Sequence, residues 1–325
     1  MSFVGSRSPE SHRVGFAGLL VRHPATKECD LVDEHAWLTE RFEADRTRLR
    51  AVAYRMLGSL SEADDAVQES WLRLSRADTR GVENLAAWLT TVVARVCLNM
   101  LRTREARREE PLGVHIPDPI ISHADGGDPE HEALLADSVG LALLVVLDTL
   151  TPAQRLAFVL HDMFAVPFEE IAPMIERSPA AARQLASRGR RRVQGAAPAP
   201  DPDLGRQRAV VEAFFAAARD GDFDALVAVL DPDIVLRADG GTVRARQTVV
   251  IHGAGDVAAQ AVLATRFAPF VRPALINGTA GVVVVAGERV LSVMGFAVAH
   301  GRIVAIDVLL DPERLAALDL AALDD

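Results

Sequence analysis

Eleven arginines in two short stretches are the residues of this chain best suited to bind an anion. Five lie between residues 95 and 108 beside one acid, Glu105, and six lie between residues 177 and 192 with no acid. The 325-residue chain has a formal net charge of -10, but charge acts locally, within a Debye length of about 8–10 Å. Two cationic stripes on an acidic protein therefore indicate contact with a polyanion such as nucleic acid. Either run alone is also consistent with a solvated helix face.

Residues 178–194, SPAAARQLASRGRRRVQ, have the pattern of a DNA-recognition helix. Ser178 suits the N-cap and Pro179 the first helical position. A short helix over residues 168–175 and a tight turn precede them, which predicts a helix-turn-helix. The apolar face is predicted to pack inward and consists of Ala182, Leu185, Ala186, Gly189 and Val193. The other face offers donors for base edges and phosphates, so the candidate DNA contacts are Ser178, Arg183, Gln184, Ser187, Arg188 and Arg191.

The first arginine-rich stretch belongs to a block of helices over residues 35–110. An apolar stripe runs along the helix that Gly58 ends and consists of Phe42, Leu49, Val52, Ala53, Met56 and Leu57. Ser61, with Asp64 three residues later, predicts a capping box that opens a second helix. The polar face of that helix is anionic and carries Asp64, Asp65, Gln68 and Glu69. A third helix over residues 84–108 has a polar side suited to unstacked bases, made of Asn84, Thr91, Arg95, Asn99 and Arg102.

A chain of this length is expected to form two or three domains, and the rest of the sequence predicts two linkers and a further domain. Residues 111–132 are rich in Pro, Gly and acid, as a linker is. Thr151 and Gln154 predict a capping box where helices resume, and a second linker covers residues 196–204. From residue 205, two helices precede strand-like runs, which predicts an α+β cone with a curved antiparallel sheet. Residues 1–34 show no sustained period and are predicted to be weakly ordered.

The helical segments resemble, in order, regions 2 and 4 of a bacterial sigma factor of the extracytoplasmic-function branch. The resemblance covers residues 34–193 and rests on RMLGSLSEADDAVQESWLRL, on NLAAWLTTVVARVCLNMLR and on the stretch from LTPAQRLAF to RGRRRV. It implies two all-α domains, region 2 at 35–110 and region 4 at 133–195. It also implies binding of core RNA polymerase by the acidic helix, and of the minus-10 and minus-35 promoter elements by the helices that begin near Asn84 and at Ser178. Pro173 and Glu176 depart from the family's helix-turn-helix pattern, and Pro173 is expected to kink or shorten the first helix.

Residues 205–325 resemble SnoaL-like, nuclear-transport-factor-like domains, which in one subgroup of sigma factors regulate the sigma core within the same chain. HIPDP at 115–119, ADGGT at 238–242 and DPERL at 311–315 are similar to three short motifs of that subgroup. The resemblance implies intramolecular contacts between the last domain and the sigma core. The residues expected to make them are Pro117, Asp118, Pro119, Asp239, Gly240, Gly241, Asp311, Pro312 and Glu313. Each motif alone is also consistent with turn chemistry.

An enzymatic role for the last domain is the alternative, because cone folds often enclose a pocket that performs proton transfer. The groups that such an isomerase or cyclase, carrying a DNA-binding module, would use are Asp239, His252, Asp256, His300 and Asp307. Fold alone does not assign chemistry, so the domain is expected to be regulatory and not catalytic. Binding of a small ligand inside the cone is a further alternative that the sequence leaves open.

The remaining composition excludes several classes of protein. No run approaches about 18 uninterrupted apolar residues, and the first residues lack the apolar core of a signal peptide. Cys29 and Cys97 lack zinc-ligand spacing and are expected to be idle thiols in a reducing compartment. A cytoplasmic protein without metal or cofactor is therefore expected.

Overall fold

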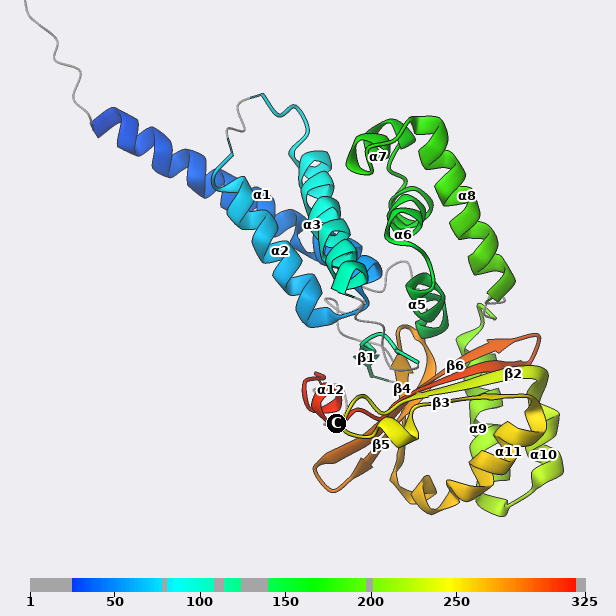
Figure 1. Ribbon diagram of the computed structural model, residues 1–325. Helices are drawn as coiled ribbons and strands as arrows, with labels where there is room; N and C mark the ends of the chain where they lie inside the picture. The colour runs from blue at the N-terminus through cyan, green and yellow to red at the C-terminus, as the bar shows by residue number, and fades with distance from the viewer. Residues whose placement is uncertain (1–24, 78–80, 108–113, 124–139, 197–200, 320–325) are drawn as a thin grey trace, which may run out of the picture. The chain divides into compact units, whose positions relative to one another are not determined.

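The computed structural model describes residues 25–77, 81–107, 114–123, 140–196 and 201–319 (Figure 1). Contacts divide the chain into two compact units, Met1–Arg41 and Phe42–Asp325. Helix α1 (Ala25–Leu57) begins in the first unit. Residues 25–34 belong to this helix, whereas residues 1–24 lie outside the described residues, so the expected weak order of residues 1–34 stays a prediction. The paragraphs below concern the second unit.

Three helices form the region 2 domain: the second part of α1, α2 (Leu60–Leu74) and α3 (Leu85–Arg107). The predicted apolar stripe is confirmed, since all six of its residues are at most 1% exposed, and the Phe42 and Trp71 rings meet at 5.1 Å between centroids. The capping box predicted at Ser61 is wrong. The helix begins two residues earlier than predicted, with Ser59 at the N-cap and no side-chain cap hydrogen bond.

By length and apolarity alone, the Leu85–Ala106 part of α3 would suffice to cross a bilayer. It contacts α2, α6 and α7 instead, as the core helix of a folded domain does. Cys97 on this helix is buried, and its burial raises the thiol pKa to about 12, which accords with the prediction of an idle thiol.

The described part of region 4 comprises α5 (Leu141–Asp148), α6 (Pro152–Phe158), a π-helical turn η1 (Val159–Met163), α7 (Phe168–Met174) and α8 (Pro179–Ala196). The capping box of Thr151 and Gln154 is confirmed, with each side chain bonded to the backbone of the other. Ser178 Oγ accepts from the Ala181 N–H at 3.2 Å and caps α8 as predicted. Pro173 lies inside α7, which ends one residue later.

The last domain places three helices, α9 (Leu204–Asp220), α10 (Phe223–Val229) and α11 (Ala254–Leu263), on one face of a sheet (Figure 1). Its strands are β2 (Leu230–Asp239), β3 (Val249–His252), β4 (Val271–Ile276), β5 (Thr279–Ala286), β6 (Arg289–Ala299) and β7 (Arg302–Leu309). Two 3₁₀ turns, η2 (Ala245–Gln247) and η3 (Thr265–Phe270), and a short helix α12 (Pro312–Ala316) complete it. Gly221 ends α9 at φ 69°, the left-handed conformation that favours glycine after a helix.

The sheet has the strand order β1-β4-β5-β6-β7-β2-β3 and differs from the prediction in two ways. It is mixed and not purely antiparallel, because β2 runs parallel to β7. Its first strand, β1 (Ile121–Ser122), comes from the segment predicted to be a linker and pairs with β4. The alternation that marks a strand needs more than two residues to be visible in a sequence, so β1 could not be found from its pattern.

The two faces of this sheet have different partners. Leu236, Ala238, Ile306 and Val308 turn toward the helices and join the apolar core with Phe214 and Phe296. On the opposite face, Leu141 of α5 packs against Gly295, where a Cβ would lie 3.1 Å from the leucine side chain. Region 4 therefore rests on the face of the sheet that the domain's own helices leave uncovered.

Candidate functional sites: two exposed helices and an interdomain clamp

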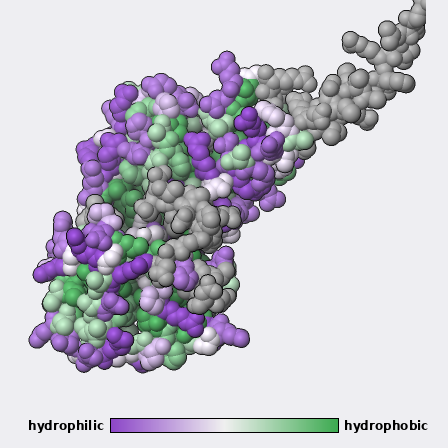
Figure 2. Space-filling view, turned by 180° about the vertical axis from the view of Figure 1, so that it is seen from behind, coloured by the Kyte–Doolittle hydropathy of each residue, from purple (hydrophilic) through white to green (hydrophobic). Residues whose placement is uncertain are grey.

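Helix α8 presents the predicted DNA contacts to solvent. Ser187 is half-buried, and the other five are exposed: Ser178, Arg183, Gln184, Arg188 and Arg191. The opposite face is apolar as predicted, with Ala182 and Ala186 at 0% exposure. Figure 2 shows hydrophilic side chains over the edge of the helical part to which α8 belongs. The helix thus combines a buried back with a cationic front, as a recognition helix requires.

Other arginines of α8 are engaged within region 4. Arg190 Nε donates to Asp162 Oδ1 at 2.8 Å, and Arg192 Nε donates to Thr149 Oγ1 at 3.1 Å. The candidate contacts differ, because Arg188 forms no ion pair with any described residue and Arg191 reaches only the Ser187 carbonyl of its own helix, at 3.4 Å. Their charge remains available to a phosphate.

The polar side of α3 divides into two groups. Asn84 Oδ1 accepts from the Ala87 N–H at 3.1 Å, and Thr91 donates to the Ala87 carbonyl, so both side chains serve the helix itself. Arg95, Asn99 and Arg102 are exposed and recur at intervals of four and three residues, which places them on one face. The structure brings these three together as one surface.

The acidic face of α2 is also exposed, but two of its carboxylates have partners. Asp64 forms an ion pair with Arg50 at 2.6 Å between Oδ1 and Nε, and Glu69 forms one with Arg73 at 2.8 Å between Oε1 and Nε. Both pairs are largely exposed, so each contributes little to stability and is readily exchanged for a partner protein. Asp65 and Gln68 are exposed beside them.

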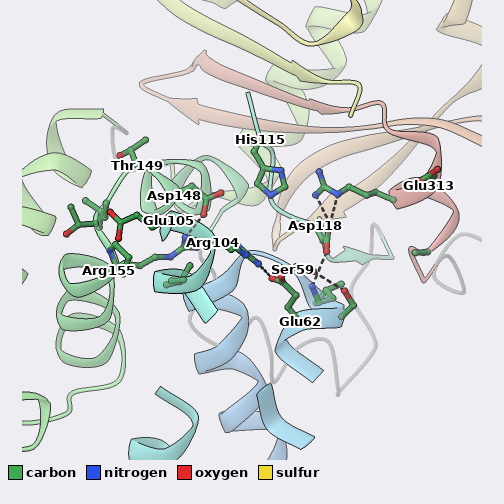
Figure 3. A pocket seen from close by; sticks show the side chains of 18 of the residues that line it. Ser59, Glu62, Arg104, Glu105, His115, Asp118, Asp148, Thr149, Arg155 and Glu313 are labelled. Carbon is green, nitrogen blue, oxygen red and sulfur yellow. Dashed lines mark hydrogen bonds and ion pairs between the residues drawn. The ribbon is translucent and has the colours of Figure 1, made fainter. Parts of the chain in front are cut away.

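The three short motifs meet at one guanidinium, that of Arg314 on α12. Its Nε donates to Asp118 Oδ1 at 2.8 Å, its Nη1 to Asp239 Oδ2 at 2.9 Å, and its Nη2 to Asp118 Oδ1 and the Ile116 carbonyl, both at 2.5 Å. Figure 3 labels Asp118 and His115, which line the pocket at this point. Asp118 belongs to HIPDP and Asp239 to ADGGT, so one side chain joins both motifs to DPERL. We call Asp118, Asp239 and Arg314 the clamp.

The clamp also reaches region 2. Asp118 Oδ2 accepts from the Leu60 N–H at 3.1 Å, and the Asp118 N–H donates to the Gly58 carbonyl at 2.8 Å. Leu60 is the first residue of α2, where a carboxylate is favoured by the unpaired N–H groups and the helix dipole. Asp118 thus binds region 2 and the last domain at the same time.

A second junction involves Tyr54 of α1. Its hydroxyl donates to the Asp118 carbonyl at 2.5 Å and accepts from Asn277 Nδ2 at 2.9 Å. Asn277 Oδ1 in turn accepts from the Ile120 N–H at 3.1 Å. Tyr54 is 3% exposed, and burial raises the pKa of its phenol well above the ordinary value. This network holds the strand β1 segment between region 2 and the sheet.

The remaining motif residues shape the turns around the clamp. Asp239 Oδ1 accepts from the Gly241 N–H at 2.9 Å, and Asp311 caps α12 through the Glu313 N–H at 2.9 Å. Gly241 has φ 60° and faces Asp311 so closely that a Cβ would overlap its carboxylate. Pro117 and Pro119 are buried, whereas the Glu313 side chain is exposed and Pro312 begins α12.

Sequence reasoning missed the residues that carry these junctions: Ile116, Tyr54, Asn277 and Arg314. Arg314 had a signal, because it lies inside the DPERL motif whose other members were singled out. Tyr54 and Asn277 had none, since a single tyrosine and a turn asparagine are unremarkable until their partners, 223 residues apart, are known.

A cavity of about 860 Å³ lies beside the clamp (Figure 3). Region 2 contributes Glu62 and Arg104, region 4 contributes Asp148 and Arg155, and His115 and Arg314 line it as well. Arg155 pairs with Asp148 and Arg104 with Glu62. Burial and the Arg314 charge lower the pKa of His115. The cavity marks where regions 2 and 4 and the last domain come together.

The groups considered for catalysis do not converge. Asp239 serves the clamp, and Asp307 is buried against Arg237 at 2.9 Å on the sheet face opposite the helices. Burial raises the pKa of Asp307. His300 lies in the β6–β7 turn at φ 55°, His252 ends β3, and Asp256 lies in the first turn of α11. In the described part of the cone, none of these five groups forms a hydrogen bond or an ion pair with another of them.

Two helical domains with exposed cationic helices, followed by an α+β cone, define a multidomain DNA-binding protein. The Sigma-70 region 2 family matches residues 41–107, and the Sigma-70, region 4 family matches residues 140–193. The ECF RNA polymerase sigma factor SigJ of Mycobacterium tuberculosis is 38% identical over 287 residues, which cover 84% of this chain and 91% of the relative. The probable ECF RNA polymerase sigma factor SigI of that species is 33% identical over 293 residues, with 87% and 97% covered.

The solved structures agree with the sequence comparisons. The crystal structure of Mycobacterium tuberculosis SigJ superposes with a TM-score of 0.69 at 35% identity, covering 87% of this chain and 99% of that one. The chain belongs to the extracytoplasmic-function (ECF) sigma factors, which direct transcription. The enzyme alternative is not favoured.

Proposed function

We propose that this sigma factor is restrained by its own C-terminal domain, which holds regions 2 and 4 together through the linker. The observation that carries the proposal is the Arg314 guanidinium, which binds Asp118, Asp239 and the Ile116 carbonyl at once. Asp118 is bonded to the start of α2 as well. Release of Arg314 would therefore loosen region 2, the linker and the last domain together.

Direct packing between regions 2 and 4 supports this reading. Arg155 Nε of α6 donates to the Arg55 carbonyl of α1 at 3.1 Å, and the Arg55 guanidinium lies 5.1 Å above the Phe164 ring. Both arginines are at most 4% exposed. Regions 2 and 4 bind different promoter elements, so packing that fixes their separation is expected to hinder binding of both elements at once.

The partner surfaces follow from the exposed side chains. Sigma domains imply binding to core RNA polymerase and to promoter DNA, and hence action in the cytoplasm. We assign polymerase binding to Asp64, Asp65, Gln68 and Glu69, of which Asp65 and Gln68 need no ion pair to be exchanged. Minus-10 binding is assigned chiefly to Arg95, Asn99 and Arg102, and minus-35 binding to the exposed front of α8. The C-terminal domain acts as a regulator and not as a catalyst, since its Asp239 is committed to the clamp.

Run-off transcription with purified core polymerase tests the proposal. The full chain is expected to form a holoenzyme and to transcribe from its cognate promoter, and a chain that ends at residue 204 is expected to bind polymerase as well. Failure of both chains to bind polymerase would sink the assignment. Equal transcription by the full chain and by a clamp variant would be consistent with the sigma function but would contradict the proposed restraint.

A further inference from the structure

A π-helical turn in region 4 supports the recognition helix at two points. The turn η1 (Val159–Met163) ends in a loop where Ala165 has φ 53°. Such turns are rare and are frequent at functional sites. Two neighbouring side chains leave this turn toward α8: Asp162, which pairs with Arg190, and His161.

His161 reaches the recognition helix through an aromatic ring. Its imidazole stacks on Phe168 with 3.8 Å between ring centroids, and its Nδ1 lies 3.1 Å from the Val166 carbonyl. Phe168 is 8% exposed and is therefore held by its surroundings. The guanidinium of Arg183 lies 5.2 Å above the same ring. Arg183 is exposed, so its cation–π contact with Phe168 restricts a group that would otherwise sample many rotamers.

The position of Arg183 makes that restriction consequential. It occupies the second turn of α8, the part of a recognition helix that enters the major groove. Arg183 and Arg190 are seven residues apart and share a face, so the π-helical turn holds that face at two points and sets how α8 is rotated. An arginine reads guanine through two parallel hydrogen bonds, which require its planar group to arrive edge-on.

We propose that Phe168 is a positioning residue, buttressed by His161, that presents Arg183 to a single base of the minus-35 element and so helps to set promoter specificity. This inference rests on the proposed function of α8. It assigns the base-reading role to Arg183, which stacks on a ring, and leaves Arg188 and Arg191, which have no such platform, to the phosphates.

Selection from a DNA pool tests the proposal. Holoenzyme made with the full chain is presented with duplexes whose minus-35 region is randomised, and base preference is measured at each position. Arg183→Ala is expected to lose at least about fivefold of the preference at one position. Phe168→Leu, which removes the ring but keeps an apolar side chain, is expected to lose about two- to fivefold at that same position. Phe168→Tyr keeps the ring and is expected to retain the preference.

Ile171→Val is the matched control, because it trims another buried side chain of α7 without touching the stack. If the role of Phe168 is purely structural, Ile171→Val should shift the base preferences in the same way when the two variants are compared at a similar loss of stability. That result would overturn the proposal. It is also overturned when Phe168→Leu selects the wild-type motif or when Phe168→Tyr behaves like Phe168→Leu. A wild-type holoenzyme that enriches no minus-35 motif contradicts the proposed function of α8 itself, which separates the two failures.

Discussion

At the scale of single residues, Asp118 is the point at which three parts of the chain depend on one another. Its Oδ2 accepts a hydrogen bond at the start of α2, and its Oδ1 accepts one from Arg314. Its backbone carbonyl accepts a third hydrogen bond from the Tyr54 hydroxyl. Hydrogen bonds to a carboxylate are stronger than those between neutral groups, so several donors around one partly buried carboxylate hold their segments together firmly. When one donor is removed, the carboxylate stays partly buried but has fewer hydrogen bonds to offset the loss of its contact with water.

Replacing Arg314 tests this dependence. Arg314→Ala leaves Asp118 and Asp239 without the guanidinium that binds both, so docking of the last domain should weaken by about 3 kcal/mol, the lower end for a buried pair that loses one partner. Hydrogen exchange at the Leu60 and Ile116 amides, which donate to these carboxylates, should speed up, and run-off transcription should rise.

Arg314→Lys should have an intermediate effect, since an ammonium cannot serve two carboxylates and a carbonyl in one plane. Arg289→Ala, an exposed arginine of β6, is the control and should change neither readout. Unaltered amide exchange in Arg314→Ala would show that the clamp contributes nothing to docking.

At the scale of elements, the helix-turn-helix departs from its usual pattern at two residues and keeps its form. Pro173 shortens α7, which ends at Met174. Glu176 then takes φ 55° in the turn, a conformation that costs a residue with a Cβ about 1–2 kcal/mol. The turn reaches its geometry at the expense of strain and not through a glycine.

Glu176→Gly should therefore stabilise region 4. Relief of the left-handed strain, less the greater flexibility of glycine in the unfolded chain, leaves a gain of about 0.5–1 kcal/mol. The expected readout is slower hydrogen exchange along α8. Ala181→Gly, which puts the same residue inside the helix, should act in the opposite direction by about 1 kcal/mol. Faster exchange in Glu176→Gly would mean that the Glu176 side chain stabilises the turn by more than its strain.

The cationic front of α8 makes a separate prediction about salt. Each lysine or arginine that neutralises a phosphate contributes about 0.9 to the slope of log affinity against log salt concentration. Arg188→Ala with Arg191→Ala should therefore lower that slope by about two, with little change in base preference. Binding of holoenzyme to promoter duplexes over a salt series measures it, and Arg302→Ala on the last domain is the control. An unchanged slope removes both residues from the phosphate contacts.

At the scale of the whole molecule, the side chains proposed to bind DNA and polymerase stay at least partly exposed while the clamp is closed. Restraint therefore acts on the separation of regions 2 and 4 and not by covering their surfaces. The last domain also shelters apolar residues of the rest of the chain: Ile116, Ile120, Ile121 and Leu141 are each at most 3% exposed. On the proposal above, the last domain therefore restrains the sigma core and also keeps these apolar residues away from water.

Two shortened chains separate these effects. A chain that ends before Asp311 loses α12 and Arg314 but keeps the sheet on which β1 pairs, so its run-off activity should exceed that of the full chain. A chain that ends before Gly205 also exposes the apolar residues named above, at a cost of about 25 cal/mol for each Å² returned to water. It should be less stable and less active than the first. Identical activity of all three chains would contradict the restraint.

Sequence patterns predicted the helices well because long apolar stripes such as that of α1 have one folded solution. The motifs around the clamp were singled out by their resemblance to those of a sigma-factor subgroup and not by a pattern. Sequence patterns did not predict β1, because two residues carry no period, nor the parallel pairing of β2 with β7, which depends on chain crossings and not on local alternation. The clamp's central residue was missed for a similar reason. An arginine such as Arg314 shows its role only when residues about 75 and 196 positions away are placed beside it.

Tyr54 gives the closed arrangement a built-in reporter. It is the one tyrosine of the sequence, and its hydroxyl lies where α1, the linker and the β4–β5 turn meet. A fluorine placed on its ring would give a single resonance, free of overlap, whose shift follows the undocking of the last domain in real time. Its absorbance in alkali would do the same, since a phenol released to solvent ionises near pH 10 whereas the buried one resists. A signal that activates this sigma factor can therefore be sought by following the fluorine resonance or the absorbance of Tyr54.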